Sequence, residues 1–119
     1  MYNIIILPFE LSVCKVTDYS KVKINEFTFI AKTDEENSLV CPTPSVPQNI
    51  THREDGWKAF RIEGELDFSL VGVLAKISTL LANNGIGIFA ISTYNTDYIL
   101  TKDMDKAADI LRSSGYNVT

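Results

Sequence analysis

The order of strand-like and helix-like patterns in residues 57–119 most restricts the fold that this chain can adopt. Apolar and polar residues alternate in some segments, as in strands, and follow helical spacing in others. The predicted order is strand 57–62, helix 70–83, strands 86–93 and 98–101, a helix that Asp103 can cap, and strand 116–119. Asp67 or Ser69 can cap the first helix, and Gly85 suits the left-handed position that closes it. This βαββαβ order predicts an α+β, ferredoxin-like fold, in which two helices cover one face of an antiparallel sheet.

The first part of the chain is strand-rich and lacks a clear helical pattern. Its strand-like runs are residues 4–7, 9–16, 27–32 and 38–41, and Asp18–Lys23 is expected to form a short helix or a turn. Three prolines between Pro42 and Pro47 then interrupt regular structure, because proline fixes φ and removes a backbone donor. We therefore predict a first domain over residues 1–48, a second over 49–119, and a linker over about 42–56.

Charge and hydropathy exclude several classes of partner. The net charge is −4 and lysine and arginine are scattered, so the chain lacks the basic patch that nucleic acid requires. No apolar run approaches the roughly 20 residues that span a membrane. The first residues also lack the basic start and small-residue cleavage site of a signal peptide. We expect no nucleic-acid or membrane partner and a cytoplasmic location.

Candidates for catalysis or metal binding are few. Cys14 and Cys41 each lie beside apolar residues, which favours two buried, reduced thiols over a disulfide. With the single His52, they do not form a zinc-binding set, and His52 is expected to be exposed in the linker. The sequence contains no nucleophile–base pair and no phosphate-binding loop. We expect no catalytic residue, no metal and no cofactor.

A polar turn between two apolar strands is the strongest indication of a binding site. Thr93, Asn95 and Asp97 lie between the strand-like runs, and Gly72 lies near the start of the preceding helix. Polar groups beside a glycine-opened helix start could hold a small zwitterion. The structural alternatives are helix–sheet packing for Gly72, turn formation for Thr93 and Asp97, and a packed ring for Tyr94.

Two long segments resemble the ACT domain family. They are Gly64–Leu74 and Gly85–Leu100, and the resemblance covers residues 57–115 well. More narrowly, the chain resembles the small bacterial ACT proteins related to the CASTOR arginine sensors. The first part resembles the abbreviated, β-rich ACT-like half that often precedes this domain, although it carries no copy of the Ile91–Leu100 motif.

The resemblance implies a regulatory module that binds an amino acid and forms a homodimer. In the family, backbone groups at the helix start hold the main-chain end of the ligand, which here are those of Val71, Gly72 and Val73. Thr93 and Tyr94 contribute at the same end, and Asp97 meets a basic side chain. Helix N-terminal N–H groups favour a carboxylate, and a carboxylate pairs with an ammonium or guanidinium group, so the chemistry agrees with these roles.

A ligand-independent interaction module is the alternative function. Such a module would pair with another protein through the edges of its sheets, where backbone hydrogen-bonding groups are free. An enzyme is disfavoured because the sequence supplies none of the usual catalytic sets.

Overall fold

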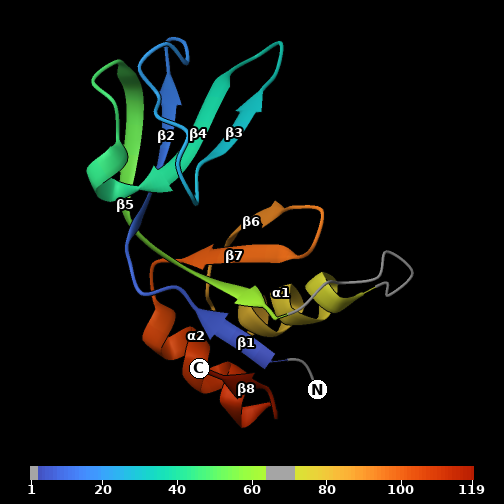
Figure 1. Cartoon of the computed structure of the whole chain (residues 1–119). Coiled ribbons are helices and arrows are strands. Elements are labelled where there is room, and N and C mark those ends of the chain that lie inside the picture. Colours follow the sequence, from blue (N-terminus) through green and yellow to red (C-terminus); the bar gives the residue numbers. More distant parts are fainter. Residues whose placement is uncertain (1–2, 64–71) are drawn as a thin grey trace. The chain divides into compact units, whose positions relative to one another are not determined.

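The structure is a computed structural model of the chain, and it describes residues 3–63 and 72–119. The chain forms two compact units, which are drawn in Figure 1. The helical unit comprises residues 1–8 and 58–119, and the inserted unit comprises residues 9–57. The chain therefore contributes one strand to the helical unit, builds the inserted unit and then returns.

The sheet of the helical unit has the strand order β6-β7-β5-β1-β8. Neighbouring strands are antiparallel, except that β1 and β8 are parallel. The strands are β1 (Asn3–Ile6), β5 (Ile50–Ile62), β6 (Phe89–Ser92), β7 (Asp97–Thr101) and β8 (Asn117–Val118). Only the last part of β5 belongs to this sheet, where it pairs with β1 and β7.

Helices α1 (Val73–Asn83) and α2 (Met104–Ser113) share one core with this sheet. The register pairs Ile4 with Ile62 and Phe60 with Ile99, so these side chains project from the same face. All four are fully buried, together with the helix residues Ile77, Leu81, Ala107 and Leu111. Both helices therefore cover the same face of the sheet, as the sequence predicts.

Two predicted helix signals are confirmed. Gly85 has a φ of 75°, and its N–H donates to the carbonyl of Ala82, while the N–H of Ile86 donates to Leu81. This is the arrangement that closes a helix with glycine in the left-handed region. The side chain of Asp103 accepts a hydrogen bond from the N–H of Lys106 and caps α2.

The inserted unit is a sheet of order β3-β4-β2-β5. Its elements are β2 (Leu11–Val16), β3 (Phe29–Lys32), β4 (Asn37–Pro42), a 3-10 turn η1 (Thr43–Ser45) and the first part of β5. This is the strand order of a ferredoxin-like sheet. Two replacement segments, residues 17–28 and residues 43–49 with η1, stand where the two helices would be. Residues 18–23 form a turn, one of the two predicted alternatives.

The core of the inserted unit lies on the face covered by these replacement segments. Its buried residues Cys14, Val16, Leu39 and Cys41 pack with Tyr19 and Val22 from the first segment, with Val46 from the second, and with Ile50 at the start of β5. Loops thus bury the apolar face that helices bury in the other unit. The abbreviated β-rich half of the prediction corresponds to this sheet.

The prediction of a linker over residues 42–56 is wrong at its second half. Regular structure resumes at Ile50, where β5 begins and pairs with β2 in register Val16–Ile50 and Leu11–Trp57. Residues 50–56 include few apolar side chains, and most of these residues are exposed. They therefore lack the apolar–polar alternation by which a sequence predicts a strand. The observed units also divide the chain differently from the boundary between residues 48 and 49.

A comparison of Ile4→Ala with Ile5→Ala tests whether β1 is part of the helical core. Ile4 is fully buried in the core, whereas Ile5 projects from the opposite face and is half-buried. We expect Ile4→Ala to lower the free energy of unfolding by about 2–5 kcal/mol, as for other buried isoleucines, and Ile5→Ala to lower it clearly less. Urea denaturation followed by circular dichroism measures both. Equal losses would contradict this placement of β1.

Candidate functional site

The turn between β6 and β7 is closed by Thr93. Its backbone N–H and its hydroxyl both donate to the carbonyl of Thr96, at 2.8 and 2.9 Å. The hydroxyl of Thr93 therefore shapes the turn, as the structural alternative predicts. Tyr94 lies in the same turn with 75% of its surface exposed, so it is not a packed ring.

Thr96 fixes this turn to the end of β5. Its side chain is buried, and its hydroxyl donates to the carbonyl of Ile62 at 2.8 Å. Sequence reasoning did not single out Thr96 as a site residue, because a threonine in a polar turn carries no distinctive signal. The contact holds the turn beside the point where the chain leaves the sheet toward α1.

Asp97 lies on the helix-covered side of this end of the sheet. It pairs with Ser92 in the β6–β7 register, and the hydroxyl of Ser92 donates to its carboxylate at 2.6 Å. Asp97 and the core residue Ile99 are two positions apart on β7, so they share a face. Asp97 itself is half-buried and thus accessible from solvent.

The start of α1 lies at the same end. α1 follows the end of β5, and Figure 1 shows its first turn and the β6–β7 turn at the same end of the helical unit. Gly72 is the N-cap residue, and Val73 is the first helical residue. Val71, with the predicted caps Asp67 and Ser69, lies outside the described residues.

Gly72 leaves the helix start open. Among the described residues, a Cβ atom at this position would meet nothing within 4 Å, and none of their side chains caps the helix. None of these residues therefore requires a glycine here for close helix–sheet packing, which counts against the structural alternative considered for Gly72. The first N–H groups of a helix have no partner within the helix, so an open start is suited to bind an anion.

Gly72→Ala and Gly72→Asn test what this glycine contributes. Its φ of 89° is unfavourable for residues with a Cβ, although asparagine tolerates the left-handed region and also caps helices. We expect Gly72→Ala to lower the free energy of unfolding by about 1–2 kcal/mol, and Gly72→Asn to lower it less. Thermal and urea unfolding measure the difference. An alanine variant as stable as the parent protein would contradict the observed backbone conformation.

The inserted unit contains a second hairpin with the same turn. The N–H of Thr33 donates to the carbonyl of Glu36, as that of Thr93 does to Thr96, and Lys32 pairs with Asn37 in the β3–β4 register. The expectation that the first part lacks a copy of the motif is thus corrected at the level of the backbone. The sequences hid this repeat because few side chains agree between the two hairpins.

In the second hairpin, side-chain hydrogen bonds occupy the residue equivalent to Asp97, which is Asn37. Lys32 Nζ donates to Asn37 Oδ1 at 3.1 Å, and Asn37 Nδ2 donates to the carbonyl of Thr17 at 2.9 Å. The amide of Asn37 is occupied by these two contacts, and no carboxylate stands where Asp97 does. The two hairpins therefore share a turn but not a candidate site.

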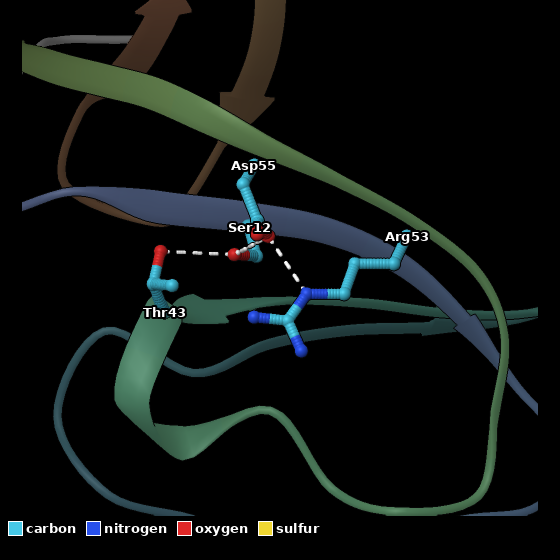
Figure 2. A network of polar contacts seen from close by, with 4 residues as sticks. All are labelled: Ser12, Thr43, Arg53 and Asp55. Carbon is cyan, nitrogen blue, oxygen red and sulfur yellow. Dashed lines mark hydrogen bonds and ion pairs between the residues drawn. The ribbon is translucent and has the colours of Figure 1, made fainter.

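A buried serine organises the polar contacts of the inserted unit (Figure 2). The hydroxyl of Ser12, which is fully buried, donates to Asp55 Oδ1 at 2.5 Å and lies 2.9 Å from the hydroxyl of Thr43. Arg53 Nε donates to the same Asp55 oxygen at 2.8 Å. The network ties β2, β5 and η1 together, and all its residues except Ser12 come from the predicted linker over residues 42–56.

Cys14 and Cys41 are buried, free thiols, as expected. Burial raises the pKa of Cys14, and it raises the pKa of Cys41 from 9.0 to about 11, with a further increase from Cys14 and an opposing effect of Arg53. A thiol needs its thiolate form to act as a nucleophile or metal ligand. At neutral pH both side chains therefore act as small apolar core residues.

The raised pKa of Cys41 predicts a loss of stability in alkali. Above pH 9 the unfolded chain releases this proton while the folded protein retains it, so the free energy of unfolding falls as the pH rises from 9.0 to about 11. Below pH 9 both states hold the proton, and the contribution is constant. We expect Cys41→Ala to show a shallower fall than the parent protein in urea titrations at pH 8 to 11. Identical slopes would contradict the assignment.

The described residues show few features of a metal site or of a membrane-spanning segment. Residues 3–63 and 72–119 contain no group of three histidine, cysteine or acidic side chains placed to hold a metal. His52 is exposed and lies 3.1 Å from the hydroxyl of Thr51. Among the helices of these same ranges, none combines the length and the apolar character needed to cross a membrane.

Comparison with known families gives one match, to the ACT domain family over residues 52–113. The match begins near the start of β5 and ends with α2, so it includes Gly72, the β6–β7 turn and Asp97. No curated protein matches the chain.

Solved structures share this fold over almost the whole chain. Protein Atu0741 from Agobacterium tumefaciens is 28% identical with a TM-score of 0.87, covering 99% of this chain and 92% of its own. VC0802 from Vibrio cholerae, a protein of unknown function, is 20% identical with a TM-score of 0.67, covering 94% and 88%. The allosteric aspartate kinase of Clostridium acetobutylicum is 12% identical with a TM-score of 0.62, covering 96% of this chain but 33% of the kinase.

Proposed function

Because the chain belongs to the ACT domain family, we propose that it is a regulatory module that binds an amino acid and has no catalytic activity of its own. ACT domains are commonly regulatory modules for small ligands, and one structural neighbour is an allosteric enzyme. Within the family, we propose kinship with the small bacterial proteins related to the CASTOR arginine sensors. The protein would act in the cytoplasm as a homodimer.

The contrast between the two helices carries this proposal. At the N-terminus of α2, the protein itself supplies the acceptor and the negative charge, because Asp103 caps the helix and Asp105 lies in its first turn. Within the part of the chain that the structure describes, α1 begins at Gly72 with no capping side chain and no acidic residue in its first turn. An amino-acid carboxylate at the start of α1 would supply the negative charge that α2 obtains from its own side chains.

Asp97 supplies the opposite charge at the same end of the sheet. It lies on the side that the helices cover and has one described contact, the hydrogen bond from Ser92. A ligand whose carboxylate binds at Gly72 and Val73 would direct a basic group toward Asp97. Tyr94, largely exposed in the turn, would cover the ligand from the side of Thr93. Val71 would extend the backbone part of the site.

Binding is tested by thermal shift and calorimetry of dialysed protein with each amino acid. A ligand that binds only the folded state stabilises it by about 2.7 kcal/mol at a hundred times Kd. We expect a shift with arginine or lysine that is larger than the shift with neutral amino acids. If no amino acid stabilises the protein at about 1 mM, where a site of useful affinity would be filled, the ligand proposal fails.

Asp97→Asn tests the side-chain end of the site, with Asp34→Asn as a control. Asp34 is an exposed acid in the β3–β4 turn, so both variants remove one negative charge from a hairpin. We expect Asp97→Asn to weaken basic ligands about tenfold through loss of a charged hydrogen bond, and Asp34→Asn to leave affinity unchanged. Equal losses for basic and neutral ligands would contradict this role of Asp97.

The alternative function, a ligand-independent interaction module, is tested by capture of partner proteins. Capture of the same partner with and without amino acids, and by both the parent protein and Asp97→Asn, would favour this alternative.

A further inference from the structure

The inserted unit contains an open cleft of about 480 Å³ between its two replacement segments. One wall is formed within residues 21–25 and the other within residues 44–48. Neither wall belongs to the candidate amino-acid site in the helical unit. The cleft exists because loops, rather than helices, cover the core of this sheet.

Cationic and neutral polar groups line this cleft. Lys21, Lys23 and Asn25 lie on one wall, and Ser45 and Gln48 lie on the other. No carboxylate of the described residues lines the cleft. Asp18 interacts with Lys21, but its carboxylate already accepts hydrogen bonds from the N–H and the hydroxyl of Ser20.

Both walls are anchored to the core. Val22, which lies between the two lysines in sequence, packs against the core, while Lys21 and Lys23 line the cleft. Val46 anchors the opposite wall in the same core. The hydroxyl of Tyr19 donates to the carbonyl of Ser38 at 2.9 Å and holds the first segment against β4.

The second wall is also restrained at its start. The N–H of Thr43 donates to the carbonyl of Glu10 at 3.2 Å, and its hydroxyl lies 2.9 Å from that of Ser12. Pro44 and Pro47 fix two backbone φ angles within the wall. A cleft with restrained walls requires little reorganisation to bind a ligand.

We infer that this cleft binds a small polyanion that carries phosphate or carboxylate groups. Its volume falls within the range of about 300–1,000 Å³ that is typical of small-molecule sites. Lys21 and Lys23 supply two ammonium charges, with Asn25, Ser45 and Gln48 as neutral donors. This inference does not rest on the proposed function.

The test measures binding of pyrophosphate and of citrate to the intact chain by calorimetry and by amide chemical shifts. Lys21→Gln/Lys23→Gln removes both cleft cations. Lys15→Gln/Lys106→Gln is the matched control, since it removes two exposed lysines outside the cleft and gives the same net charge. We expect the cleft variant to weaken binding at least about tenfold, the loss typical of one charged hydrogen bond, and the control to bind as the parent protein does.

Saturable binding that shifts the amides of Ser45 and Gln48, and that the cleft variant alone loses, supports the inference. A preference for pyrophosphate identifies phosphate as the recognised group, and a preference for citrate identifies carboxylate. The inference is overturned by absence of saturable binding up to about 10 mM, or by equal affinities of the two double variants. Neither result changes the expectation for amino acids, because that site uses other residues.

Discussion

The backbone pairing of β5 is the constraint on which both units depend. Residues 50–57 of this strand pair with β2, and residues 58–62 pair with β1 and β7. One strand therefore begins as an edge of the inserted sheet and ends inside the sheet of the helical unit. Its last residue, Ile62, accepts the hydrogen bond of Thr96 and so positions the β6–β7 turn beside the point from which the chain continues to α1.

The sheets of the two units have similar strand orders but are covered by different kinds of segment. In the helical unit, helices bury Phe60 and Ile99 and leave an uncapped helix start near Asp97. In the inserted unit, loops bury Cys14 and Leu39 and leave a cleft lined by lysines. The segments that cover each sheet determine where a candidate site can form. The side chains of the two hairpins also differ, with Asp97 in one and Asn37 at the equivalent position of the other.

Sequence patterns predicted the helical unit well because its elements carry strong local signals. The apolar spacing of α1, the cap at Asp103 and the closing Gly85 each follow from local rules. The role of β1 could not be predicted, since pairing between Ile4 and Ile62 joins residues far apart in the sequence. The first half of β5 was missed because its side chains are mostly exposed, so its strand character comes from pairing with β2.

The candidate site was predictable in its residue types but not in its hydrogen bonds. The motif indicated a hydroxyl, an aromatic ring and a carboxylate near a glycine, and the structure places the turn and the helix start at one end of the sheet. It also shows that the hydroxyl of Thr93 is engaged within the turn, and that Thr96 fixes that turn. Neither role can be read from a polar segment, because both depend on which backbone carbonyls lie nearby.

The energetics of the candidate site support the proposal of a homodimer. An anion at a helix start contributes at most about 2 kcal/mol, and a charged hydrogen bond to Asp97 about 3 kcal/mol. Together these terms correspond to a Kd of about 0.2 mM before the loss of ligand freedom is counted. None of the described atoms lies within 4 Å of a Cβ placed at Gly72, and Tyr94 is exposed, so the described residues enclose little of a ligand. A sensor that responds at micromolar concentrations therefore needs a second surface over this end of the sheet, and a second copy of the chain would provide one.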